Sequence, residues 1–262
     1  MTKRYDALII GGGHNGLVCA FYLARAGLKV RVLERRHVVG GAAVTEEFHP
    51  SFRNSTASYT VSLLRPKVIA DMKLHDRGFR IIERTISNFF PFPDTYLTLG
   101  GGTARTQQQF ARFSQKDADA YPAYDAALEK VAQVLRDLAL KTPPNVGGGL
   151  RALLSGATQG WPIAKMEIEA QRDLLDVFTK SARDFLDGWF EDDHVKSAFA
   201  FDAVVGNYAG VSTPGSAYVL LHHVFGEVNG KYGAWGHSVG GMGAITQAMA
   251  RACEDAGVEI SL

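Results

Sequence analysis

The sequence contains only two cysteines and no excess of either charge. Cys19 and Cys253 are too few for a disulfide framework, and neither belongs to a CxxC or CxxxxC pair. We therefore expect a cytoplasmic, reducing location and no thiol redox chemistry. Lys and Arg together number 28, against 27 Asp and Glu. Because the charges balance, no global field would recruit nucleic acid or an anionic membrane, and no nucleic-acid partner is expected.

Long apolar runs and metal-ligand clusters are also missing. No uncharged apolar stretch reaches the roughly 18 residues of a membrane-spanning helix, and residues 1–6 lack the layout of a secretory signal. A transmembrane segment is not expected, while peripheral membrane contact through exposed aromatics stays open. His222 and His223 are adjacent, so they point in different directions on any regular element, and no metal site is expected. The acidic run 191–193 is interpreted as a cap or turn.

The first residues read as a strand, a helix and a second strand. Residues 5–10 form a short apolar run that enters a glycine cluster, and residues 15–26 have apolar side chains at helical spacing. Gly27 is a helix stop, and residues 29–33 predict a second strand that ends at Glu34. The sequence therefore predicts one complete βαβ unit here.

The glycine cluster has the spacing GxGxxG, at Gly11, Gly13 and Gly16. The first glycine permits a tight turn, the second lets the backbone approach a pyrophosphate, and the third lets the helix pack closely on the strand. The helix N-terminus adds N–H groups and a positive dipole for the phosphates. We place Gly12 and Asn15 in the same loop. A purely structural glycine turn is the alternative.

An acid and a second glycine pair narrow the choice of cofactor. Glu34 ends the second strand, where a carboxylate accepts hydrogen bonds from an adenosine ribose and repels the 2′-phosphate of NADP. Six residues later comes the doublet Gly40-Gly41. The segment LERRHVVGGAAVTEEF resembles the second FAD motif of the phytoene-desaturase and amine-oxidase superfamily, which favours FAD over NAD.

The resemblance implies roles for the residues of this segment. Glu34 would hold the ribose, Arg35 would lie near the adenine or its phosphates, and Gly40, Gly41 and Ala42 would let the backbone pass close to the cofactor. The family usually has Arg directly after the doublet, where this chain has Ala42. One expected charge near the flavin is therefore missing.

Two later segments extend the resemblance over essentially the whole chain. Residues 57–66 (ASYTVSLLRP) and 233–245 (GAWGHSVGGMGAI) are similar to a desaturase-related branch of FAD oxidoreductases, the branch of pyridine nucleotide-disulfide oxidoreductase domain-containing protein 2. In that branch the polypeptide continues well beyond the corresponding point. Residues 258–262 begin a strand that would sit inside a parallel sheet. We therefore expect a C-terminally truncated chain.

The predicted fold class is α/β. It comprises a Rossmann-like FAD-binding domain, incomplete, interrupted by a mixed α+β substrate or cap region. The expected segments are 1–65 for the first part of the FAD-binding domain, 66–232 for the cap region, and 233–262 for the return. The return contains a helix over 243–256.

The middle region, residues 66–232, has a different sequence pattern, and it contains no second strand-glycine-helix unit. Residues 96–99 predict a hairpin arm, 117–141 a long amphipathic helix, and 169–189 another helix. Residues 155–162 are interpreted as a connection. The run NFFPFP, 88–93, either lines an apolar substrate pocket or a membrane-facing mouth, or packs between the two predicted domains.

The predicted function is FAD-dependent oxidoreduction, by hydride removal from, or flavin-assisted rearrangement of, a small apolar substrate such as a polyene or a lipid-like molecule. No catalytic side chain is assigned. Two roles remain possible for His14, Trp235 and His237. They either contact the cofactor or the substrate, or they pack within the structure. The alternatives are a lipid or prenyl carrier resembling Rab GDP-dissociation inhibitor, and an inactive fragment.

Overall fold

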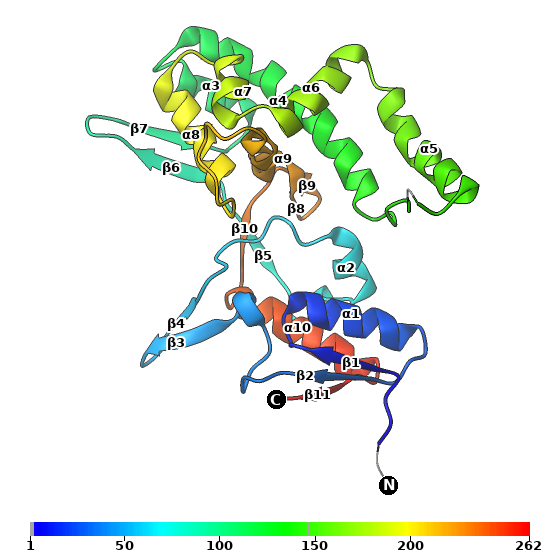
Figure 1. Ribbon diagram of the computed structural model, residues 1–262. Coiled ribbons are helices and arrows are strands. Elements are labelled where there is room, and N and C mark those ends of the chain that lie inside the picture. Colours follow the sequence, from blue (N-terminus) through cyan, green and yellow to red (C-terminus); the bar gives the residue numbers. More distant parts are fainter. Residues whose placement is uncertain (1–2, 146) are drawn as a thin grey trace. The chain divides into compact units, whose positions relative to one another are not determined.

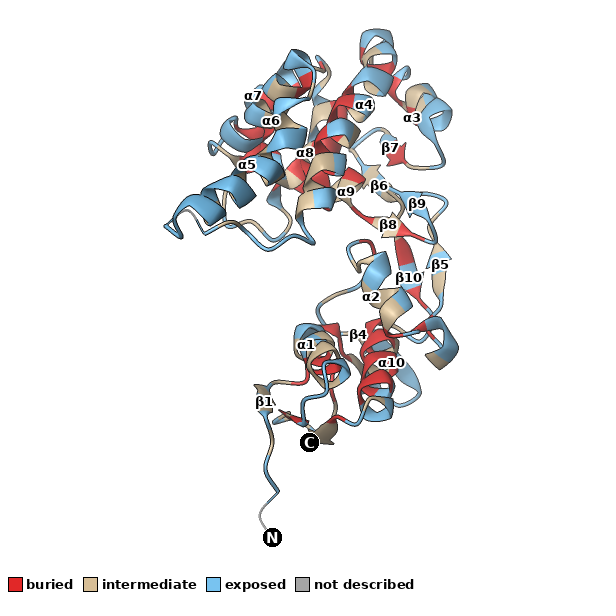
Figure 2. Cartoon of the chain, turned by 90° about the vertical axis from the view of Figure 1, so that its right-hand side faces the viewer, coloured by how far each residue is buried: buried red, intermediate tan, exposed pale blue. Residues whose placement is uncertain are grey.

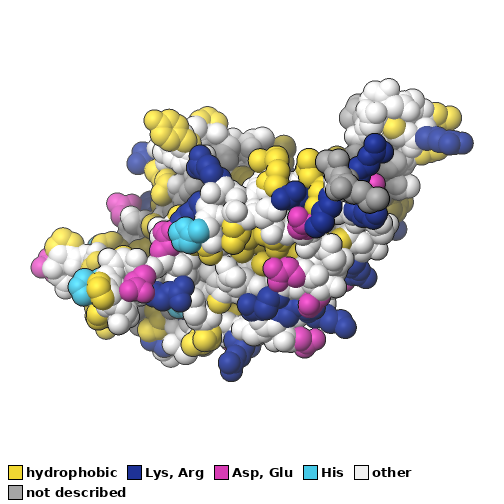
Figure 3. Space-filling model, turned by 90° about the horizontal axis from the view of Figure 1, so that it is seen from below, with side chains coloured by type: hydrophobic (Ala, Val, Ile, Leu, Met, Phe, Trp, Pro, Cys, Tyr) yellow, Lys and Arg dark blue, Asp and Glu magenta, His cyan; other side chains and the backbone are white. Residues whose placement is uncertain are grey.

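The computed structural model describes residues 3–145 and 147–262 (Figure 1). Contacts divide the chain into two compact units, Met1–Arg84 with Glu227–Leu262, and Thr85–Gly226. Among the described residues, no helix is long and apolar enough to cross a membrane, and no cluster of three or more His, Cys, Asp or Glu side chains is arranged to hold a metal ion. On the face seen in Figure 3, basic and acidic side chains are interspersed.

The first unit is built on a three-stranded parallel sheet. Its strands are β1 (Ala7–Ile10), β2 (Val30–Leu33) and β11 (Glu259–Ser261), in the order β1-β2-β11. The central strand β2 buries Val30 and Val32. β11 is parallel to β2, as predicted, but among the described residues it lies at the edge of the sheet and not inside it.

Helices α1 (His14–Arg25) and α10 (Met242–Asp255) pack against each other and share this core. Leu17 of α1 and Met249 of α10 are both fully buried, and α10 is largely red in Figure 2. Residues more than 200 positions apart therefore complete one hydrophobic core. The helix predicted over 243–256 is confirmed to within one residue.

The hairpin of β3 (Thr45–His49) and β4 (Phe52–Ser55) caps the start of α10. The Oγ1 of Thr45 accepts the Gly243 N–H at 2.8 Å, and the Oγ of Ser55 accepts the Met242 N–H at 3.0 Å. A Cβ on Gly243 would come within 2.7 Å of the Thr45 backbone nitrogen. Gly243, in the first turn of α10, is therefore required for close packing on the hairpin, and the hairpin supplies the caps that the helix's own N-terminal residues do not.

The remaining elements of the first unit place its boundaries at other residues than predicted. They are η1 (Gly41–Ala43), α2 (Pro66–Asp71), η2 (His75–Arg77), β5 (Ile81–Glu83), β8 (Glu227–Val228), β9 (Lys231–Tyr232) and β10 (Gly236–Ser238). β10 pairs with β5 antiparallel, and Met72, Leu74 and Phe79 are buried in the same core as α1. For this reason the unit extends to Arg84 and resumes at Glu227, whereas the predicted boundaries were residues 65 and 232.

The second unit is mostly helical around an aromatic core. Its elements are β6 (Asn88–Pro91), β7 (Tyr96–Leu99), α3 (Thr103–Phe110), α4 (Gln115–Leu138), α5 (Leu150–Ala164), α6 (Ile168–Thr179), α7 (Ala182–Asp187), α8 (Asp193–Val204), η3 (Ser216–Leu221) and α9 (His222–Phe225). Tyr124 is fully buried, with its ring centroid 4.9 Å from those of Phe190 and Phe199. Such edge and tilted ring pairs stabilise a core beyond their buried area.

The second unit confirms some predicted elements and corrects others. The hairpin arm at 96–99 is confirmed, because β7 pairs with β6, which contains most of the aromatic run. The long helix runs from Gln115 to Leu138, close to its predicted range. The helix predicted over 169–189 is instead α6 and α7, separated where Lys180 is extended and Ser181 accepts the Asp184 N–H as a cap.

The connection predicted at 155–162 is wrong, because these residues lie within helix α5. Its apolar residues recur at spacings of three and four, a periodicity that outweighs the glycines, which weaken a helix by only about 1 kcal/mol each. Pro162 lies in the last turn of α5, where it removes one hydrogen bond to the preceding turn, and the helix ends two residues later at Ala164.

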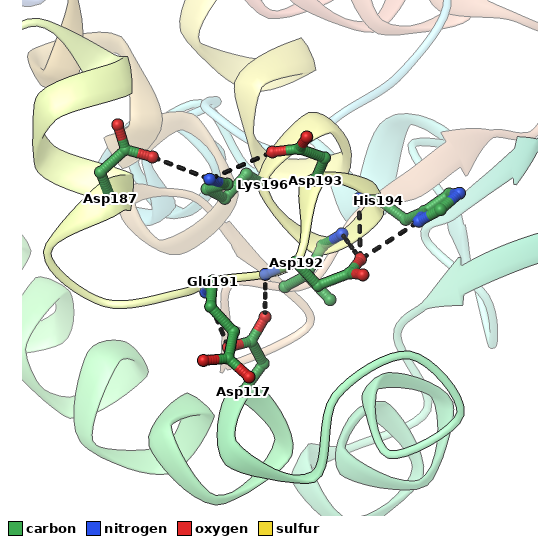
Figure 4. Close-up of polar contacts among 8 residues, drawn as sticks. Asp117, Asp187, Glu191, Asp192, Asp193, His194 and Lys196 are labelled. Atoms are coloured by element: carbon green, nitrogen blue, oxygen red, sulfur yellow. Dashed lines mark hydrogen bonds and ion pairs between the residues drawn. The ribbon is translucent and has the colours of Figure 1, made fainter.

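The acidic run 191–193 has the capping role that was predicted (Figure 4). Asp117, fully buried at the start of α4, accepts the backbone N–H groups of Glu191 and Asp192, each at 2.9 Å. Asp192 in turn accepts the His194 N–H at 2.8 Å and so caps α8. These carboxylates fix a helix junction by satisfying backbone donors.

The close contact between α10 and the hairpin predicts that a larger residue at Gly243 destabilises the fold. We expect Gly243→Ala to lower the free energy of unfolding by about 1–3 kcal/mol, because the new methyl group would displace the Thr45 backbone. The control Gly160→Ala places its methyl in open space within α5 and should raise stability by about 0.5–1 kcal/mol. Urea unfolding measures both, and equal effects of the two variants would contradict the packing argument.

Candidate functional site

The glycine loop begins with a turn that requires glycine. The Gly11 N–H donates to the Leu33 carbonyl at 2.8 Å, beyond the last paired residues of β1 and β2. Gly11 has a φ of 99°, in the region that disfavours side chains. The chain then enters α1 at His14, so strand and helix are joined by three residues.

Gly16 lets the first turn of α1 pack against this loop. A Cβ at Gly16 would lie 2.2 Å from the Gly11 carbonyl oxygen, which no side chain tolerates. Gly13 occupies the N-cap position and makes no side-chain cap to the helix. The first N–H groups of α1 are thus available for an anion, and the helix dipole adds positive potential there.

The carboxylate of Glu34 lies against the same loop. One oxygen accepts the Gly12 N–H at 2.7 Å, and the other accepts the Arg36 N–H at 2.9 Å. The backbone donors of Arg36 and then Gly12 lower the pKa of Glu34 below its ordinary value. Glu34, the acid predicted to accept a ribose, is therefore held charged beside the glycine loop.

The doublet Gly40-Gly41 is brought to the same place by backbone contacts. The Gly40 N–H donates to the Gly12 carbonyl at 2.9 Å, and Gly13 and Gly40 form an isolated parallel bridge. Gly40 has a φ of 139° and Gly41 a φ of 57°. The two glycine motifs, 29 residues apart at their first members Gly11 and Gly40, are thus adjacent in space.

The other predicted site residues lie near the two glycine segments and are more exposed to solvent. Asn15 is exposed in the first turn of α1, with His14 beside it, while Arg35 and Ala42 are exposed on either side of the Gly40 turn. Sequence reasoning missed Arg36, which donates its backbone N–H to Glu34 and pairs its guanidinium with Glu46 of β3. The doubled arginine after the acid was the available signal.

A cavity of about 430 Å³ opens near the start of α10. It is lined by Thr45, Arg53, Asn54, Ser55, Tyr59, His237, Ser238, Gly240, Gly241 and Met242. His237 is one of these residues, whereas Trp235 is not. The Nε2 of His237 accepts a hydrogen bond from the Arg84 guanidinium at 2.9 Å, and its Nδ1 lies 3.2 Å from the Tyr59 carbonyl. These partners assign a neutral ring with the proton on Nδ1.

The cysteines are free in the structure and differ in environment. Cys19 is exposed on α1. Cys253 is buried on α10, donates to the Leu17 carbonyl at 3.1 Å, and has its pKa raised to about 12 by burial. A thiol in this state is a poor nucleophile, because the thiolate is the reactive form.

Comparison with known protein families identifies the region that contains the glycine loop of Gly11 to Gly16. Residues 9–88 match the model of the NAD(P)-binding Rossmann-like domain. This region is a Rossmann-like dinucleotide-binding domain. The predicted fold class is confirmed, and the match covers α1, β2 and the Gly40 turn.

Relatives extend the similarity along the chain. It is 39% identical, over 99% of its length, to pyridine nucleotide-disulfide oxidoreductase domain-containing protein 2 of Rattus norvegicus. It is 27% identical, over 97% of its length, to the lycopene-forming phytoene desaturase of Pantoea ananas. The chain spans 47% and 48% of these relatives, about half of each. The resemblance predicted from the sequence is confirmed.

Solved structures share the fold at low sequence identity. A putrescine oxidase bound to putrescine has a TM-score of 0.58 at 19% identity, covering 99% of this chain and 51% of the oxidase. A Rab GDI from Plasmodium falciparum has a TM-score of 0.54 at 10% identity, covering 99% and 58%. At these identities the fold alone is shared. The family match supports a dinucleotide as the cofactor.

The hydrogen bonds of Glu34 predict a measurable acid dependence. Its lowered pKa means that the ionised carboxylate stabilises the fold above its unfolded pKa of about 4.3, and that this contribution is lost as the pH falls through the folded-state value. We expect Glu34→Gln to weaken the fall of Tm between about pH 5 and pH 3. Glu254→Gln, at an exposed position of α10, is the control. An unchanged acid profile in Glu34→Gln would contradict the assigned contacts.

Proposed function

We propose that this chain carries the amino-terminal part of an FAD site, in an oxidoreductase that removes hydride from, or rearranges, an apolar substrate. The observation that carries the proposal is the convergence of the uncapped α1 N-terminus, the charged Glu34 carboxylate and the Gly40-Gly41 turn. These are the anion site, the ribose acceptor and the close backbone approach that a bound dinucleotide needs.

The residues fit such a ligand in their chemistry. The first amides of α1 and the Gly13 N–H would hold the diphosphate, because they offer N–H donors in a positive dipole, while the Gly12 N–H is already bound to Glu34. Glu34 would accept hydrogen bonds from the adenosine ribose, with Arg36 fixing its orientation through the backbone. The positive φ values of Gly40 and Gly41 keep side chains away from the path of the cofactor.

Three observations favour FAD over the nicotinamide cofactors. The charged Glu34 would repel the 2′-phosphate of NADP. The Gly40-Gly41 motif resembles the second FAD motif of desaturases and amine oxidases. The fold neighbours include putrescine oxidase and cyclohexylamine oxidase. When bound, the flavin would supply the hydride acceptor, and the protein would supply position and electrostatics.

The cavity beside Thr45 supports a place for the substrate or the ring end of the cofactor. Thr45 lines the cavity and follows the Gly40 turn after only η1 and Val44, so the two features are close together in the chain. Within the cavity, Tyr59 offers an aromatic surface, and the neutral His237 is held by two hydrogen bonds. No catalytic side chain is assigned. Thiol chemistry is not proposed, because Cys253 is buried with a raised pKa.

A non-catalytic carrier is the second candidate, favoured by the fold similarity to Rab GDI. A lipid carrier has no need of an anion-binding loop, a ribose acceptor and a second glycine turn together. The absorbance spectrum of the purified protein distinguishes the two functions. Flavin bands support the oxidoreductase, and a colourless protein that binds prenyl lipid supports the carrier.

The proposal is tested by titrating FAD and following the quenching of its fluorescence. We expect saturable quenching, and at least a tenfold weaker FAD affinity for Glu34→Ala, since about 1.4 kcal/mol of a charge-assisted hydrogen bond is lost. Glu254→Ala removes the same charge from an exposed position of α10 and should leave the affinity unchanged.

Two outcomes would overturn the assignment. If Glu34→Ala and Glu254→Ala bind FAD equally, Glu34 does not hold the ribose. If the protein does not bind FAD but binds NADH, and Glu34→Ala weakens that binding, the residues form a dinucleotide site but the assignment of FAD is wrong. No binding of either cofactor, in a protein shown to be folded by circular dichroism, supports the inactive fragment.

A further inference from the structure

Helix α5, Leu150–Ala164, has an apolar face that its own unit, Thr85–Gly226, leaves largely exposed. Leu150, Leu153, Leu154 and Trp161 each expose 58–73% of their surface. With Ala157 they recur at spacings of three, four and seven residues, which places them on one side of the helix. No described residue of α5 is buried, and the helix is mostly pale blue in Figure 2.

The opposite side of α5 holds the helix in place. The Gln159 side chain donates to the Thr142 carbonyl at 3.1 Å, and a Cβ at Gly156 would touch Pro144 at 3.6 Å. Gly156 and Gln159 belong to a stripe of partly buried positions. The helix therefore packs on the preceding segment through small and polar residues, and its leucines and Trp161 point away from that contact.

The charged residues within α5 and in the segments that flank it in the sequence are of one sign, although the whole chain is nearly neutral. Between Asp137 and Glu167 the sequence has no acidic residue, while it has Lys141, Arg151 and Lys165. The Lys165 ammonium lies 5.2 Å from the centre of the Trp161 ring, a cation–π distance. An aromatic ring with a cation beside it suits a boundary where apolar chains meet anionic head groups.

The length of α5 decides how it would meet a bilayer. Fifteen residues give about 22 Å of helix, less than the roughly 30 Å of a hydrocarbon core. An amphipathic helix of this kind lies in the plane of the interface, with its apolar face among the acyl chains and its cations at the phosphates.

We propose that α5 docks the protein on an anionic phospholipid bilayer. Leu150, Leu153, Leu154 and Trp161 insert into the interface, and Arg151 and Lys165 contact the lipid phosphates. A second copy of the chain is a poorer occupant, because pairing two α5 faces would bring the like charges of Arg151 and Lys165 together without a counter-charge. This docking does not depend on the cofactor.

The test is flotation of the purified protein with vesicles of phosphatidylcholine, with and without phosphatidylserine. We expect flotation with the anionic vesicles, and at least a tenfold loss of partitioning for Leu153→Ser/Trp161→Ser, since two large apolar contacts are removed. Tyr208→Ser removes another fully exposed aromatic of the same unit and serves as the matched control. Arg151→Gln/Lys165→Gln should lose the preference for anionic lipid and the sensitivity to salt.

A second readout locates the contact. Tryptophan fluorescence should shift to shorter wavelength on adding anionic vesicles, and the shift should disappear in Trp161→Phe. The proposal is overturned if the protein does not float with anionic vesicles, or if Leu153→Ser/Trp161→Ser floats as well as Tyr208→Ser. Self-association that Leu153→Ser/Trp161→Ser abolishes, without vesicle binding, would assign α5 to a second copy instead. Circular dichroism checks that each variant is folded.

Discussion

The candidate site depends on close backbone contact between two glycine segments. The Gly40 N–H donates to the Gly12 carbonyl, and Gly13 pairs with Gly40, so the first glycine loop and the second glycine turn lie side by side. Glu34 joins the same network through the Gly12 N–H. A side chain on the loop side of these contacts would separate the segments, because a Cβ on Gly41 would already come within 3.3 Å of Gly13.

Residues from the other end of the sequence complete the first unit through helix packing and strand pairing. α10 packs on α1, and β11 pairs with β2, so residues near position 250 close a core begun by the first thirty. Thr45 and Ser55 cap α10 at its glycine-rich start. The intervening residues 85–226 form a unit with a separate aromatic core around Tyr124. A dinucleotide-binding unit thus encloses a second, helical one in the sequence.

The two proposals concern different chemistry and stand on different residues. The cofactor proposal rests on backbone donors and one carboxylate, a polar arrangement selective for a phosphate-bearing ligand. The lipid proposal rests on exposed leucines and a tryptophan, which are costly to leave in water, and on the cations beside them, which would attract anionic head groups. An enzyme that acts on an apolar substrate would gain from lying on the phase where such molecules dissolve.

Local patterns in the sequence were sufficient for the βαβ unit, the glycine loop, the acid at residue 34 and helix α10, because strand-turn-helix signals depend on residues close in the chain. Only the tertiary structure revealed the role of Arg36, the capping of α10 by Thr45 and Ser55, and the extension of the first unit to Arg84. It also showed that the apolar face of α5 is exposed, although the helical spacing of residues 155–162 is itself a local signal that their glycines obscured. These features are set by which distant segments meet, and the spacing of residues along one segment does not encode its partner.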